Sequence, residues 1–157
     1  MLGTFGFSYV GLLYLAMLFT PNLLWTKRRP KGDVPVRENP VLVWLERIGQ
    51  VWVTAVVLVF SDFNPAPVGW WNLWLALSFA LMLLYEACWV RYFWNPTAEN
   101  FYRNLWGIPI PLATLPVAAF FLLGVYGKVG LLMIGAALLG VGHIGIHVQH
   151  CRKLQGK

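Results

Sequence analysis

Three histidines near the C-terminus, His143, His147 and His150, are the residues whose types and spacing best fit a chemical role. On a helix of about 100° per residue, His147 lies about 40° and His150 about 20° from His143, so all three share one face. Imidazoles bind divalent metal ions and transfer protons, and the i, i+4 spacing of His143 and His147 is that of a two-histidine chelate. The pattern predicts that these two residues bind a divalent metal ion, as a cofactor, or act as an acid–base pair.

Charged residues inside apolar runs are the next candidates, because ionisable groups in a membrane helix usually face a functional interior. Glu86 interrupts a long apolar run and has no basic residue three or four positions away on its own helix. We therefore expect Glu86, His143 and His147 to form one catalytic unit, in which a carboxylate could complete a nitrogen and oxygen metal shell. The residues expected to bind a ligand or an anionic head group are Arg91, Arg103 and Glu46.

The composition decides the class of protein that must position these side chains. The chain has 157 residues, of which 59% are hydrophobic and only 11% are charged. So few polar residues cannot cover the core of a soluble domain, and we predict an all-α, polytopic membrane protein with one transmembrane helical domain, 1–157. The net charge of +6 lies beside apolar runs, which indicates anionic membrane lipids as partners and no nucleic acid.

Two Asn-Pro dipeptides predict helix starts, because asparagine is a good N-cap and proline suits the first helical position. They are Asn39-Pro40 and Asn95-Pro96. The segment that follows the second dipeptide alternates charged and aromatic residues, which is typical of a short amphipathic helix lying at the membrane interface. We expect this interfacial helix at about 96–106.

Uncharged runs between polar and helix-breaking segments predict five spanning helices. A polar stretch with several prolines separates the first two of them and is typical of an exposed loop, 26–39. The interfacial helix precedes the fourth span. The five expected spans lie at about 3–25, 40–61, 70–94, 110–126 and 129–151.

The distribution of basic residues predicts the orientation of this bundle. Of the 12 lysines and arginines, only Lys128 falls on the side of the membrane that holds the N-terminus. Cytoplasmic segments carry the excess of positive charge in membrane proteins. We therefore expect a multi-pass protein with its N-terminus outside and with the loop 26–39 and the C-terminus in the cytoplasm.

The depth of the candidate residues follows from this arrangement at about 1.5 Å per residue. Counted from the cytoplasmic helix ends, Glu86 lies about 12 Å deep and Glu46 about 9 Å deep. On the last span, His143 lies about 13 Å deep and His147 roughly 7 Å deep. Two carboxylates and two imidazoles from three helices are thus expected in one slab near the cytoplasmic surface.

These patterns favour an enzyme or a ligand-binding protein that acts on a lipid-like or membrane-embedded small molecule. A small proton-coupled transporter is an alternative, although an odd number of spans cannot form two inverted repeats and would require an oligomer. A further alternative is an accessory subunit without catalysis, in which the small residues Ala136 and Gly140 on the histidine face only let another helix pack closely. The oligomeric state, the ligand and the presence of a metal ion stay open at this point.

Overall fold

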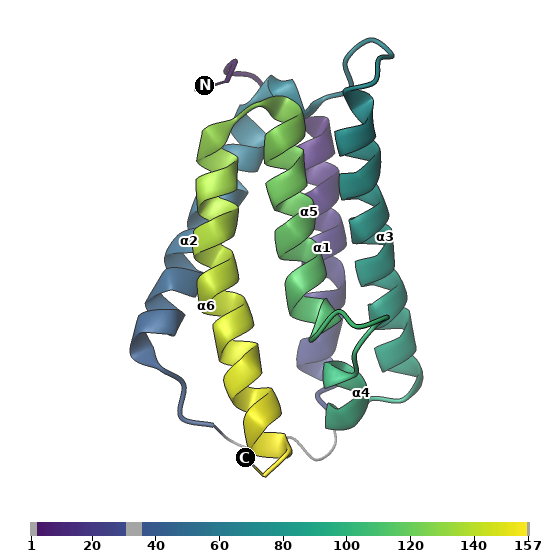
Figure 1. Ribbon diagram of the computed structural model, residues 1–157, viewed down its shortest axis with the longest axis vertical. Coiled ribbons are helices and arrows are strands. Elements are labelled where there is room, and N and C mark those ends of the chain that lie inside the picture. Colours follow the sequence, from purple (N-terminus) through teal and green to yellow (C-terminus); the bar gives the residue numbers. More distant parts are fainter. Residues whose placement is uncertain (1–2, 31–35, 157) are drawn as a thin grey trace.

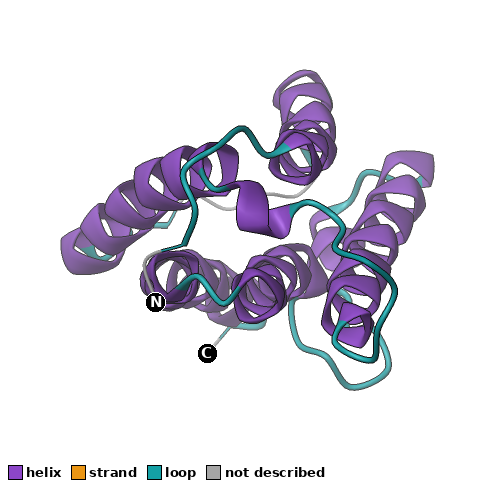
Figure 2. Cartoon of the chain, turned by 90° about the horizontal axis from the view of Figure 1, so that it is seen from above, coloured by secondary structure: helices purple, strands orange, loops and turns teal. Residues whose placement is uncertain are grey.

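The computed structural model describes residues 3–30 and 36–156. All the regular secondary structure in these residues is helical (Figure 2). No β-strand occurs in these residues, so the predicted all-α fold class is confirmed. The elements are α1 (Tyr9–Lys27), α2 (Pro40–Val59), the 3-10 helix η1 (Ser61–Phe63), α3 (Asn72–Trp94), α4 (Ala98–Tyr102), α5 (Pro111–Gly127) and α6 (Gly130–Leu154).

Four of the helices, α1, α2, α3 and α6, are long and apolar enough to cross a membrane. Helix α5 is also apolar, but its 17 residues fall short of the roughly 20 that a straight spanning helix needs. The five long helices alternate in direction, so the two chain ends lie at opposite ends of the bundle (Figure 1). The architecture broadly agrees with the five predicted spans. We call the end that holds the N-terminus the upper end.

The Asn39-Pro40 signal marks the start of α2 as the sequence predicts. The Asn39 side chain accepts a hydrogen bond from the backbone N–H of Val41 at 2.9 Å, and Pro40 occupies the first helical position. The second dipeptide behaves differently, because Thr97 caps α4 by accepting from the N–H of Asn100 at 3.2 Å. Helix α4 consequently covers only the middle of the segment 96–106.

The first helix begins later than the sequence predicts because the residues before it pair with the end of α2. The N–H of Gly6 donates to the carbonyl of Val59 at 2.9 Å, and the N–H of Ser8 donates to that of Leu58 at 3.0 Å. Ser8 then caps α1 by accepting from the N–H of Gly11 at 2.8 Å. The chain from Gly3 to Ser8 is therefore an extended segment rather than the first part of a span.

Each long helix packs against a specific neighbour. Helix α2 packs mainly against α6, α6 packs against α5, and α5 packs against α3, whereas α1 touches α2 and α3 through fewer residues. The contact between α1 and α2 is close near the upper end, where Gly11 lies directly against the carbonyl of Val57. Below this point the lower end of α2 lies well away from α1 (Figure 1).

Glycines allow α2 and α6 to approach closely. A side chain at Gly142 would collide with the backbone of Glu46 and Leu42, and one at Gly49 would collide with the backbone of Leu139. Gly140, which the sequence places on the histidine face, instead contacts the side chain of Val117 on α5. The small residues of α6 therefore serve packing against two neighbours, α2 and α5.

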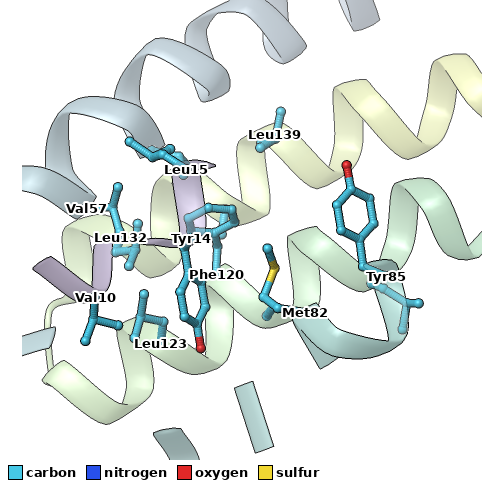
Figure 3. Close-up of a cluster of buried hydrophobic side chains, with 14 of the residues drawn as sticks. Val10, Tyr14, Leu15, Val57, Met82, Tyr85, Phe120, Leu123, Leu132 and Leu139 are labelled. Atoms are coloured by element: carbon cyan, nitrogen blue, oxygen red, sulfur yellow. The ribbon is translucent and has the colours of Figure 1, made fainter. Parts of the chain in front are cut away.

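Buried side chains from all five long helices fill the core (Figure 3). Tyr14 is fully buried, and its hydroxyl lies 3.0 Å from the Ser78 hydroxyl, which donates to the carbonyl of Ala119 at 2.7 Å. Its ring contacts Phe120 edge to face at 5.8 Å between centroids. The buried hydroxyls of Tyr14 and Ser78 are thus paired.

Candidate functional site

A cavity of about 330 Å³ lies inside the bundle, on the lower side of the core. All five long helices and α4 contribute side chains to its wall, which is mostly apolar. The widening gap between α1 and α2 leaves it partly open, and both Phe19 and Gln50 line it while remaining exposed. The polar side chains on the wall include Asn22, Glu46, Gln50, Thr54, His143 and His147.

A hydrogen bond between Glu46 of α2 and His143 of α6 forms one side of this cavity. The carboxylate of Glu46 lies 2.5 Å from Nδ1 of His143, and the two side chains are 20% and 24% exposed. The contact is possible because Gly142, one residue before His143, lets α6 approach the backbone of Glu46. A carboxylate on one ring nitrogen fixes the orientation of the imidazole and leaves the other nitrogen for a second partner.

His147 lies one turn further down α6, next to His143. The two imidazole rings are 4.6 Å apart between centroids, and His147 also stacks on Phe101 of α4 at 5.7 Å. Within residues 3–30 and 36–156, Nδ1 of His147 is buried and has no hydrogen-bond partner. The predicted shared face of His143 and His147 therefore exists, and it points toward the cavity.

His150 takes part in a separate contact closer to the lower end. Its Nε2 lies 3.0 Å from the carboxylate of Glu38, a residue that precedes α2. Beside it, the N–H of Asn39 donates to the side-chain oxygen of Gln149 at 3.2 Å. The C-terminal part of α6 and the chain leading into α2 are therefore linked outside the cavity.

Glu86 is not among the residues that line the cavity, although one of its carboxylate oxygens is buried without a hydrogen-bond partner in the described part of the chain. The preceding residue, Tyr85, takes the cavity position on α3, and Asn22 donates to its hydroxyl at 2.8 Å. Neighbouring residues on a helix point about 100° apart. The structure therefore brings Glu46, rather than Glu86, to His143 and His147, and a catalytic role for Glu86 stays a prediction.

Arg91 and Arg103 also lie outside the cavity wall. The Arg91 guanidinium donates to the carbonyl of Arg103 at 2.9 Å, and the Asn100 side chain donates to the carbonyl of Arg91 at 2.9 Å. These bonds connect the end of α3 to the segment around α4. The expected role of the two arginines in binding a head group stays a prediction.

Metal binding was the other expectation for the histidines. Among the residues that the structure describes, no three His, Cys, Asp or Glu side chains are arranged to hold one metal ion. His143 and His147 could supply two ligands of a site, but its further ligands would have to come from water or from a bound molecule. The divalent metal ion therefore stays a prediction for this pair.

Several residues that line the cavity were not predicted from the sequence, although some of them have a recognisable sequence feature. Asn22 and Gln50 are polar residues inside apolar runs, and this could have identified them as lining an interior cavity. Trp25 and Tyr85 lie on the same wall, and the Trp25 indole N–H is buried without a partner within the described residues. Aromatic residues are common throughout this chain, so no pattern distinguished these two.

Comparisons of this chain with protein-family models, with characterised proteins and with solved structures find no match. The cavity and its polar groups are therefore the basis for a functional assignment.

Proposed function

We propose that this protein is an integral membrane protein that binds a small, lipid-like amphipathic molecule in the cavity between its helices. The cavity itself is the observation that carries the proposal, because its wall is mostly apolar while polar side chains converge on it from α1, α2 and α6. Ligand sites typically measure about 300–1,000 Å³ and combine apolar walls with a few placed polar groups. The volume of about 330 Å³ suits a single small molecule.

The route to this site supports a ligand that is dissolved in the membrane. The cavity opens where α1 and α2 diverge, and Phe19 of α1 and Gln50 of α2 are two of its exposed wall residues there. Both residues lie within helices that are apolar enough to span a bilayer. A molecule in the acyl-chain region can therefore reach the cavity sideways without crossing an aqueous phase.

A bulky side chain at position 50 should block this route. We expect Gln50→Trp to lose most of the small molecule that the wild-type protein retains after purification, because an indole at this position fills the opening. Native mass spectrometry of the purified protein measures the bound mass directly. The matched control is Val51→Trp, which adds the same ring at a neighbouring position that is 72% exposed and does not line the cavity. A wild-type protein without bound mass, or a Gln50→Trp variant that keeps it, would contradict the proposal.

We further propose that the lower end of the bundle faces the cytoplasm. The distribution of basic residues between the two ends supports this orientation, since basic residues concentrate at cytoplasmic helix ends. The upper end carries Lys128, whose ammonium lies 4.9 Å from the centroid of the Trp71 ring. The described basic residues at the lower end include Lys27, Arg28, Arg29, Arg37, Arg91, Arg103, Arg152 and Lys153.

Thiol labelling tests this orientation. In a background with Cys88→Ala and Cys151→Ser, we expect a membrane-impermeant maleimide to label Val68→Cys in intact cells and to leave Asn104→Cys unlabelled. Val68 is fully exposed at the upper end and Asn104 is exposed beside α4 at the lower end. Both variants should react after the membrane is permeabilised. The reverse pattern in intact cells would show that the lower end lies outside.

A further inference from the structure

The cavity wall carries few charged side chains, which bears on the kind of molecule it can hold. No lysine or arginine is among the described residues that line it, and its only carboxylate belongs to Glu46. That carboxylate is already paired with His143. A charged ligand loses its hydration inside the bundle and needs an opposite charge to offset this loss. The wall therefore favours an uncharged ligand.

At one end of the cavity, buried ring nitrogens have no hydrogen-bond partner among the described residues. Trp25 and His147 both line the cavity, and both rings contact Phe101, at 6.1 Å and 5.7 Å between centroids. The Trp25 Nε1 and the His147 Nδ1 are buried without a partner in the part of the chain that the structure describes. An indole N–H can only donate, so it requires an acceptor. A ligand oxygen at this end would supply the acceptor.

The remaining wall contains both aromatic and aliphatic side chains. Aromatic rings attract planar rings by stacked and edge-to-face contacts. Among the described residues, six aromatic side chains line the cavity: Phe19, Trp25, Tyr85, Trp89, Phe101 and Phe120. The aliphatic side chains of the wall include Val53, Val117 and Leu139. The arrangement suits an amphiphile whose polar ring lies near His147 and whose apolar part extends toward the middle of the bundle.

We infer that the ligand is an uncharged, ring-containing amphiphile whose hydroxyl or carbonyl oxygen accepts a hydrogen bond from Nε1 of Trp25 beside His147. This inference rests on the proposed function, because it names the chemistry of the molecule that the same cavity binds. A hydroxyl or carbonyl on a lipid-soluble ring system meets the requirement, whereas a fatty-acid carboxylate or a phospholipid head group does not.

Three naphthalene derivatives of nearly equal shape test the inference. Acetylnaphthalene is a neutral ketone, isopropenylnaphthalene replaces the carbonyl oxygen by a methylene group, and naphthoate carries a negative charge. Their binding to the full-length protein in lipid nanodiscs is measured by equilibrium dialysis, with empty nanodiscs as the control for partitioning. We expect the ketone to bind about five-fold more tightly than the hydrocarbon, as one neutral hydrogen bond provides, and naphthoate to show no saturable binding.

A variant that removes only the indole N–H tests whether Trp25 causes the difference in affinity between the ketone and the hydrocarbon. Trp25→Phe keeps an aromatic ring against Phe101 and should weaken ketone binding about five-fold, to the level of the hydrocarbon. Binding of the hydrocarbon itself should not change, and this also shows that the variant is folded. The matched control is Trp94→Phe, at a position 85% exposed at the end of α3, which should leave both affinities unchanged.

The outcomes separate this inference from the proposed function. Equal saturable binding of ketone and hydrocarbon, saturable binding of naphthoate, or an unchanged ketone affinity in Trp25→Phe would overturn the inference alone, provided that Gln50→Trp still blocks binding. If the wild-type protein binds none of the three probes above the level of empty nanodiscs, both the inference and the proposed function are overturned.

Discussion

Replacing Gly142 with alanine is expected to lower the free energy of unfolding by about 1–3 kcal/mol. A Cβ atom at this position would collide with the backbone N–H of Glu46 and the carbonyl of Leu42. Backbone atoms of a helix cannot move aside singly, so α2 as a whole would have to shift away from α6. Such a shift also separates Glu46 from His143 and should weaken ligand binding in the cavity.

Gly145 provides the matched control on the same helix. A Cβ atom there meets only the side chain of Leu42, at 2.9 Å, and that side chain can adjust. Alanine also gains about 0.5–1 kcal/mol over glycine inside a helix, and this gain is the same at both positions. We therefore expect Gly145→Ala to be as stable as the wild type or slightly more stable. Reversible unfolding in mixed micelles, followed by helical circular dichroism, measures both variants, and equal stability of the two would contradict the close contact at Gly142.

The second large effect is expected when Glu46 is replaced and His143 is kept. Methionine has a similar length but accepts no hydrogen bond from the imidazole, so Glu46→Met should cost about 1–3 kcal/mol of unfolding free energy. Most of this cost comes from leaving a partly buried polar group without a partner. Replacing both partners with apolar side chains removes that group, and the double variant Glu46→Met/His143→Met should recover most of the lost stability.

The shallower pair supplies the comparison for this experiment. The imidazoles of the two pairs are similarly exposed, at 20% for His150 and 24% for His143, but Glu38 is 41% exposed whereas Glu46 is 20% exposed, so water can take the place of the Glu38 carboxylate. Exposed ion pairs contribute about 0–1 kcal/mol, and we expect Glu38→Met to change the stability by less than about 0.5 kcal/mol. The same unfolding measurement decides the outcome. A double variant at positions 46 and 143 that is as unstable as Glu46→Met would mean that the loss comes from packing and not from the unpaired imidazole.

The sequence predicted the helices well because their signals are local. Long uncharged runs predicted the long helices, and Asn39 with Pro40 predicted the start of α2, which the cap confirms. The start of α1 was not predictable from such signals, because residues 3–8 are uncharged and their extended conformation depends on hydrogen bonds to α2. At the second Asn-Pro dipeptide, the competing cap is Thr97, two residues after Asn95.

The candidate site was predicted only in part because helix rotation was not determined by the sequence. A helix in a membrane is apolar on all sides, so periodicity does not reveal which face points inward. The shared face of His143 and His147 follows from spacing alone and could be predicted. Whether Glu46 or Glu86 faces that pair depends on the rotation of α2 and α3 about their axes. The contact of Gly142 with the backbone of α2 orients α2, whereas tertiary hydrogen bonds such as that from Asn22 to Tyr85 orient α3.

The packing of α2 on α6 also has a consequence for the biosynthesis of the protein. Helix α2 ends at Val59 and its main partner ends at Leu154, so more than half of the chain is synthesised between the two. At ribosomal rates of about 5–20 residues per second, the synthesis of α2 is complete roughly 5–20 s before that of α6. During this interval Glu46 has no imidazole beside it, and the glycine-lined face of α6 does not yet exist. A temporary partner for α2, such as an insertion chaperone or a water-filled cleft of the insertion machinery, would therefore be needed most at this stage of synthesis.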